Sequence, residues 1–204
     1  MNRMIKAVIA GVITLWSLLV FAQAVPGKWE NFTADGKVFS CQIPSEWNQD
    51  VTNQDAVSKV YGITLYAPDA KRGQPVFIQV DYYPKDNLVN KTPQVFIKRH
   101  LDPLFKEEGE TNSPISTVEV GGRICQYFEQ IQFRYFPPET INPTQTKNVI
   151  KFIIVPETDD SYFVLRIESP VDVIDRYQPV FDTMVKSFKP QAISNSQPSH
   201  AAKE

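Results

Sequence analysis

Histidine and cysteine are scarce in this chain, with two of each among 204 residues. Structural zinc sites are built from Cys and His ligands, and general acid–base catalysis most often uses histidine. So few of these side chains exclude a Cys/His zinc cluster and argue against histidine-centred catalysis. The chain also lacks the common motifs of nucleotide-binding proteins, serine hydrolases and zinc proteases. We therefore expect no enzymatic activity, no metal site and no cofactor.

Glycine is scarce relative to proline, with 8 glycines and 16 prolines. Proline interrupts helices, so this balance argues against long uninterrupted helices. Hydrophobic residues make up 42% and aromatic residues 12% of the chain, which supplies a core and excludes global disorder. The length fits one domain or two at most.

The first 24 residues have the pattern of a signal peptide. Arg3 and Lys6 precede an apolar run from Ala7 to Ala22, and Ala22-Gln23-Ala24 fits the small-x-small cleavage rule. We expect cleavage after Ala24 and a location outside the cytoplasm, in a periplasm or the medium. The alternative is an uncleaved N-terminal helix that anchors the chain, although the run is shorter than the roughly 20 residues that span a bilayer.

Cleavage would leave a slightly acidic protein. It removes Arg3 and Lys6, so 21 basic residues become 19 against 23 acidic ones, and the net charge becomes −4. Nucleic-acid-binding proteins usually carry a basic surface, and so do segments that bind anionic lipid. We therefore expect neither nucleic-acid binding nor lipid insertion by the processed chain.

Residues 25–189 are expected to form one α+β domain, and the polar residues 190–204 a disordered tail. β-Branched and aromatic segments bounded by Gly and Pro predict about seven strands, antiparallel because turn signals join them. Seven predicted strands cover residues 37–43, 60–67, 76–83, 115–120, 123–136, 149–155 and 162–167, and residues 29–33 are a candidate for a short first strand before them.

Two helices are predicted. Thr92-Pro93 starts one, which Pro103 ends or kinks. The second follows Ser169-Pro170 and carries an apolar stripe to Phe188. Pro179 lies within this stripe, so we expect either a kink there or a helix that begins only near Gln178.

Two segments resemble PsbP-like domains, a group that includes the Ran-binding Mog-type fold and secreted bacterial members. Val38–Trp47 looks like the opening of these domains, a strand followed by Pro, two residues and Trp. Tyr177–Lys189 is similar to their closing helix, which ends in Ser-Phe. We interpret Trp47 and Phe188 as core residues that cover the sheet.

The resemblance implies a fold and a kind of function. The implied fold is an antiparallel sheet flanked by helices, an α/β/α sandwich. The implied function is binding to a larger protein partner or membrane complex, without a shared reaction. The metal positions of the photosystem II subunit find no match in this chain, so no metal ligand is carried over.

Cys41 and Cys125 both fall on apolar faces of predicted strands. An exported protein meets an oxidising compartment, and an even number of cysteines permits one disulfide. The alternative is two buried thiols too far apart to bond. The sequence leaves both open.

Three further features could carry chemistry, and each has a simpler explanation. Glu157, Asp159 and Asp160 could bind Ca²⁺, but three acids in a hairpin more often form a solvated turn. His100 lies beside Lys98 and Arg99, which indicates a solvated helix face. The aromatic residues of 127–136 occur on both faces of their strand, which favours a sheet covered on two sides.

The leading contact region is the proline-rich loop after residue 136. It contains Pro137, Pro138, Glu139 and Ile141, and stiff loops present surfaces at low entropic cost. We therefore predict an exported, non-enzymatic module that docks on a protein partner and exposes an apolar patch. The alternatives are a small-ligand carrier or unrecognised hydrolase, which requires a concave pocket with convergent polar groups, and a structural role in the envelope.

Overall fold

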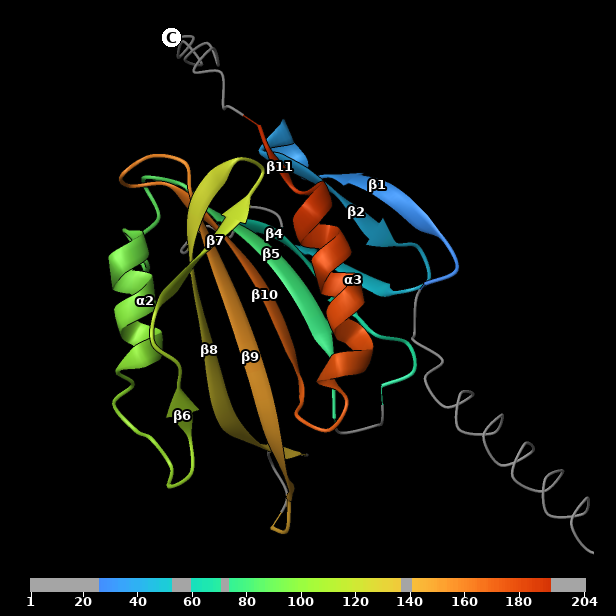
Figure 1. Cartoon of the computed structure of the whole chain (residues 1–204), viewed down its shortest axis with the longest axis vertical. Helices are drawn as coiled ribbons and strands as arrows, with labels where there is room; N and C mark the ends of the chain where they lie inside the picture. Colours follow the sequence, from blue (N-terminus) through green and yellow to red (C-terminus); the bar gives the residue numbers. More distant parts are fainter. Residues whose placement is uncertain (1–25, 53–59, 71–73, 137–140, 192–204) are drawn as a thin grey trace, which may run out of the picture.

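The computed structural model describes residues 26–52, 60–70, 74–136 and 141–191 (Figure 1). The predicted signal peptide therefore lies outside the described residues, as do Pro137, Pro138, Glu139 and residues 192–204 of the predicted tail. Within the described residues, no helix is long and apolar enough to cross a membrane.

The described chain folds into two antiparallel sheets and two α-helices, which confirms the α+β class. The larger sheet has the strand order β3-β4-β5-β10-β9-β8-β6, with β7 paired to β8, and the smaller has the order β1-β2-β11. The larger sheet consists of β3 (Asn48–Thr52), β4 (Tyr61–Tyr66), β5 (Phe77–Tyr83), β6 (Thr111–Asn112), β7 (Ser116–Val120), β8 (Arg123–Phe136), β9 (Thr144–Pro156) and β10 (Tyr162–Pro170). The smaller consists of β1 (Trp29–Thr33), β2 (Phe39–Pro44) and β11 (Lys189–Pro190).

The two faces of the larger sheet carry separate hydrophobic clusters. Successive side chains of a strand point to opposite faces. Ile153 and Val155 of β9 belong to one cluster, whereas Phe152 and Ile154 belong to the other. β10 divides in the same way, so β9 and β10 lie between the two clusters.

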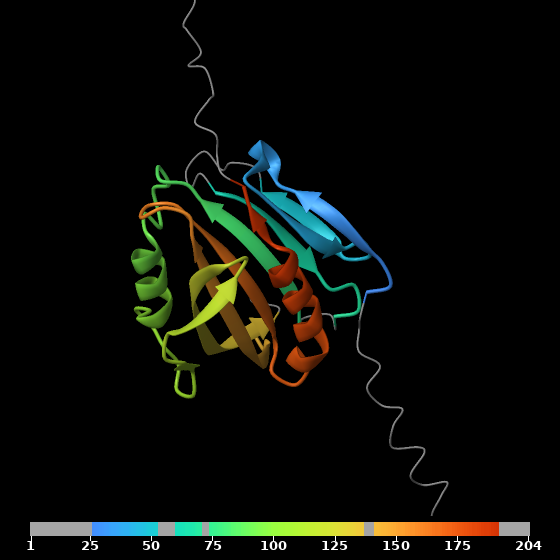
Figure 2. The ribbon, with the colours of Figure 1, turned by 45° about the horizontal axis from the view of Figure 1, so that its top comes forward.

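Helix α3 (Ile174–Ser187) and the small sheet cover one face, forming what we call the α3-side cluster. Figure 2 shows this helix beside the blue strands β1 and β2. Trp47 packs edge-on against Tyr177, with ring centroids 6.0 Å apart. Phe188 packs on Phe39 and Phe163, at 5.8 and 5.3 Å. The predicted core roles of Trp47 and Phe188 are thus confirmed.

Helix α2 (Pro93–Leu101) packs on the opposite face and forms the α2-side cluster. Thr92 caps the helix because its Oγ1 accepts a hydrogen bond from Val95 N at 3.3 Å. The helix buries Phe96 and Ile97 against aromatic and aliphatic side chains of β8, β9 and β10. It is nine residues long, so it covers only part of this face.

Several predicted boundaries need correction. Lys37 does not begin a strand: it ends the 3₁₀ turn η1 (Asp35–Lys37) in the left-handed region, at φ 57°. Pro179 does not delay the last helix, which begins at Ile174 and contains this proline. Three short strands, β3, β6 and β11, were not predicted, because their segments are polar or only two residues long.

Candidate functional site

The part of the α2-side sheet face that extends beyond α2 is polar. Alternate residues of five strands lie on it, as their register shows. They include Asp81 of β5, Arg166 and Glu168 of β10, Asn148 of β9 and Arg134 of β8. These side chains meet because neighbouring strands place residues of the same face opposite one another.

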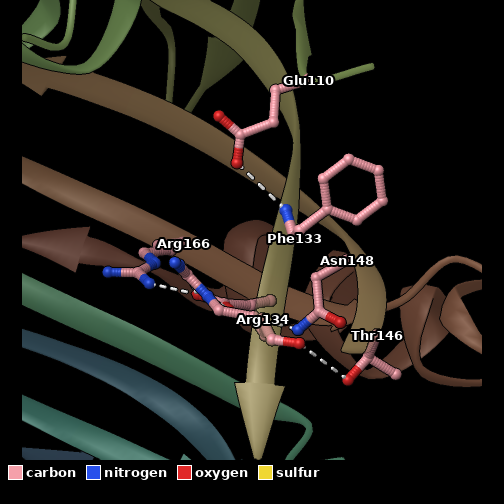
Figure 3. Close-up of polar contacts among 7 residues, drawn as sticks. Glu110, Phe133, Arg134, Thr146, Asn148 and Arg166 are labelled. Atoms are coloured by element: carbon pink, nitrogen blue, oxygen red, sulfur yellow. Dashed lines mark hydrogen bonds and ion pairs between the residues drawn. The ribbon is translucent and has the colours of Figure 1, made fainter. Parts of the chain in front are cut away.

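Glu168 is the centre of this polar group, and it is only 3% exposed. Arg134 donates two hydrogen bonds to it, from Nε to Oε1 at 2.6 Å and from Nη2 to Oε2 at 3.2 Å. Arg166 donates to Oε2, and Asn148 Nδ2 donates to Oε1 at 3.3 Å. Figure 3 shows Arg134, Arg166 and Asn148 turned toward one another. The carboxylate therefore accepts four hydrogen bonds, two at each oxygen.

The two arginines keep Glu168 ionised. Burial alone would raise the pKa of Glu168, but hydrogen bonds and charge from Arg134 and Arg166 outweigh it and hold the pKa below its usual value. The hydrogen bond to Glu168 in turn raises the pKa of Arg134, against the opposing effect of burial. The group therefore carries two positive charges and one negative charge.

Asp81 lies on the same face and is also buried. Its register partner on β4 is Gly62, where a Cβ would lie 2.6 Å from Val80 O and would also clash with the Asp81 carboxyl. Burial raises the pKa of Asp81 to about 7, although a hydrogen bond from Gln79 and the charge of Arg166 lower it. Burial therefore disfavours the ionised form of Asp81.

A pocket of about 330 Å³ opens beside the Glu168 group. Its apolar lining residues include Phe77, Tyr135 and Phe136, and its polar lining residues, which we call the polar wall, include Arg134, Arg166 and Asn148. The guanidinium carbon of Arg166 lies 4.9 Å from the centre of the Phe77 ring, within the range of a cation–π contact. This site is concave and has convergent polar groups, as the small-ligand hypothesis requires.

His100 does not lie on a solvated helix face, which corrects our interpretation from the sequence. Its ring stacks on Phe96 with centroids 4.1 Å apart, and lies 4.8 Å from the Phe152 ring. Its Nδ1 is 2.9 Å from Phe96 O. Burial lowers the pKa of His100, and nearby Arg166 and Arg99 add to this, while the contact with Phe96 O opposes it. His100 therefore closes the exposed side of the α2-side cluster.

Exposed apolar side chains occur on two loops at the same end of the molecule (Figure 1). Leu104 and Phe105 lie between α2 and β6 and are 95% and 90% exposed. Ile141 lies between β8 and β9 and is 98% exposed. We call these three residues the apolar end.

The two loops of the apolar end are joined through β8. Tyr135 Oη donates to Glu107 Oε2 at 2.6 Å, and Gln145 Nε2 donates to Tyr135 Oη at 2.7 Å. Phe133 N donates to Glu110 Oε1 at 3.1 Å. These hydrogen bonds hold the α2–β6 loop against the β8–β9 hairpin. We call the bonded segments beneath the exposed side chains the base of the apolar end.

Of the predicted contact residues, only Ile141 is described, and its side chain is free to contact a partner. The cysteines are different: Cys41 and Cys125 are both buried and not bonded to each other. Burial raises the pKa of the Cys41 thiol to about 12, and it also raises the pKa of Cys125. Neither has the lowered pKa of a reactive cysteine.

The acidic turn is held by a hydrogen bond within it and by an ion pair with Lys85. Ser161 Oγ donates to Glu157 Oε2 at 3.0 Å, and Lys85 Nζ lies 3.3 Å from Asp160 Oδ2. Across the described ranges, no three His, Cys, Asp or Glu side chains are close enough together to hold a metal ion.

Sequence reasoning missed the Glu168 group and Asp81. Arg134 and Glu168 are 34 residues apart and meet across β9, so their contact depends on strand register. One signal was present: Arg166 and Glu168 interrupt an otherwise apolar strand, and buried charges need partners.

Comparison with known proteins gives distant structural likenesses. No family profile and no curated protein matches the sequence. LpqN of Mycobacterium tuberculosis, involved in cell envelope biogenesis, is 15% identical, with 74% of this chain and 82% of that one covered and a TM-score of 0.45. Cyanobacterial PsbP of Synechocystis is 11% identical (80% and 92% covered, TM-score 0.47). The Ran-binding protein Mog1p of Saccharomyces cerevisiae is 12% identical (80% and 95% covered, TM-score 0.47).

A protein of Bacteroides thetaiotaomicron also matches, at 14% identity and a TM-score of 0.45. The match covers 83% of this chain, and the chain spans about half of that protein's length, 51%. The PsbP-like family that the sequence resembles includes proteins such as PsbP and Mog1p. Membership of this chain in that family stays a prediction.

Proposed function

We propose that this protein is an exported, non-enzymatic module that docks on a protein partner, either free or within a membrane complex, through its apolar end. The observation that carries the proposal is the near-complete exposure of Leu104, Phe105 and Ile141. Single exposed apolar residues are ordinary, but three on two adjoining loops are unusual. Protein interfaces obtain most of their binding energy from a few such side chains.

The rigidity of the base supports docking. Tyr135, Glu107 and Gln145 tie the two loops together, so little conformational entropy is lost when a partner covers them. Export rests on the sequence of residues 1–24, and the membrane complex on the family resemblance.

Photocrosslinking in the cells that produce the protein tests docking and export together. A photoreactive phenylalanine analogue replaces Phe105 in one variant and Ile141 in another. The control carries it at Leu88, which is 60% exposed and precedes α2, whereas Phe105 follows that helix. We expect one common protein adduct from positions 105 and 141, absent from position 88. The mass of the adduct should show a chain that begins at Val25.

A double variant, F105S/I141S, measures the energy of the contact. With the captured partner purified, we expect its affinity to fall about tenfold or more, because both anchors are lost. The control L88S should bind as the unmodified chain does. Identical adducts from all three positions, or unchanged affinity in the double variant, would contradict the proposal.

A further inference from the structure

The pocket beside Glu168 has more hydrogen-bond donors than the Glu168 carboxylate can accept. A guanidinium carries five N–H donors, and the four hydrogen bonds to Glu168 use two from Arg134 and one from Arg166. Among the described residues, Arg166 Nε is buried and has no hydrogen-bond partner. The Glu168 oxygens already accept two bonds each, so they cannot take more donors.

The same wall holds an unused acceptor. Asn148 is 2% exposed and lines the pocket. Its Nδ2 donates to Glu168, whereas its Oδ1 is buried without a partner among the described residues. A buried amide oxygen left unpaired costs free energy, so a ligand N–H or O–H that reaches it would be favoured.

The charge of the wall selects an anion. Arg134 and Arg166 carry two positive charges, and Glu168 is the one carboxylate that forms ion pairs with them among the described residues. Asp81 acts on Arg166, and Glu110 on Arg134, by charge alone and without a hydrogen bond. The unused guanidinium donors therefore favour a carboxylate ligand, because guanidinium groups bind carboxylates in a fixed geometry. Phe77, Tyr135 and Phe136 also line the pocket and offer apolar surface to the body of the ligand.

We propose that this pocket binds a carboxylate that bears an adjacent N–H donor and an apolar side group. The carboxylate takes the free guanidinium donors, the N–H donates to Asn148 Oδ1, and the apolar group packs on Phe77 and Phe136. An N-acylated amino acid has this chemistry, whether it is a free metabolite or the C-terminal residue of a polypeptide. The site shares Tyr135 with the hydrogen bonds beneath the apolar end, but it does not include Leu104, Phe105 or Ile141 and does not depend on the proposed docking.

The probe is N-acetylphenylalanine, titrated into the full chain and followed through backbone amide resonances. We expect saturable shifts at Phe77, Asn148 and their neighbours. The amide of the same compound lacks the charge, and 3-phenylpropionate lacks the N–H, so each should bind about tenfold more weakly. A peptide that ends in phenylalanine distinguishes a polypeptide C-terminus from a free metabolite as the ligand. Tighter binding than that of N-acetylphenylalanine indicates a C-terminus, and equal binding indicates a free metabolite.

Two variants should change the affinity in opposite directions. Arg134→Gln removes one positive charge and should weaken N-acetylphenylalanine binding about tenfold. Glu168→Gln releases both guanidinium groups from their carboxylate and should strengthen it, although it lowers stability. Loss of structure alone cannot produce opposite effects. Arg176→Gln, on the α3 side of the sheet, should leave binding unchanged.

Three outcomes would overturn the proposal. The first is no saturable shift with N-acetylphenylalanine. The second is equal binding of its uncharged amide. The third is Arg134→Gln and Glu168→Gln moving affinity in the same direction. None of these results bears on the crosslinks from the apolar end, so the two proposals fail separately.

Discussion

At the scale of the residue, Asp81 is a charge that the fold holds at a cost. Its folded pKa of about 7 lies above the ordinary value of 3.8, so the folded chain binds a proton more tightly than the unfolded chain. The stability associated with this group is therefore highest below about pH 4. This contribution to the free energy of unfolding decreases as the pH rises from about 4 to about 7, and it does not change further above that pH.

Asp81→Asn removes this dependence and keeps an oxygen that can accept from Gln79. We expect the variant to be more stable than the unmodified chain by as much as about 4 kcal/mol at about pH 8, and equally stable at about pH 4. Urea unfolding at the two pH values measures the difference. Asp50→Asn, at an exposed position of β3, controls for the loss of an acidic charge. An equal gain in the free energy of unfolding at both pH values would contradict the raised pKa of Asp81.

Single residues also show how far the sequence can be interpreted. Trp47 and Phe188 were predictable as core residues, because each matches an aromatic position of the PsbP-like pattern and such large side chains gain much from burial. The Arg134–Glu168 pair was not, because its two residues belong to strands separated by β9. A register shift of one residue would place the two side chains on opposite faces.

At the scale of the element, the helix that closes the α2-side cluster depends on its first turn. Thr92→Ala removes the hydroxyl that accepts from Val95 N, and should lower the free energy of unfolding by about 1 kcal/mol. Thr92→Ser keeps a hydroxyl and should retain most of that stability. Thermal unfolding of the two variants measures the difference, and equal losses would show that the cap contributes nothing.

Element boundaries were predictable where turn chemistry and hydrophobic pattern agree. β8 begins and ends at Arg123 and Phe136 as predicted, after the Gly121-Gly122 turn, whose glycines have φ of 58° and 78°. β3 was missed because its sequence, NQDVT, lacks an apolar face, and only pairing with β4 makes it a strand. The polar pocket, whose lining comes from four strands in register, β5, β10, β9 and β8, was beyond such local patterns.

At the scale of the whole molecule, β9 and β10 belong to both hydrophobic clusters. A side chain lost from one face therefore loosens strands on which the other face depends. We infer that the two clusters unfold together, although α2 and α3 lie on opposite faces of the sheet.

Phe96→Ala, in α2, tests this coupling through amide hydrogen exchange in α3. Phe96 is 4% exposed, so its truncation should cost about 3 to 5 kcal/mol. If β9 and β10 transmit the loss, slow amides of α3 should lose the same protection free energy as those of α2, because both then exchange by global unfolding. Leu104→Ala, at a side chain 95% exposed, should change neither helix. Faster exchange confined to α2 would instead mean that this helix opens alone, without unfolding the sheet on which it packs.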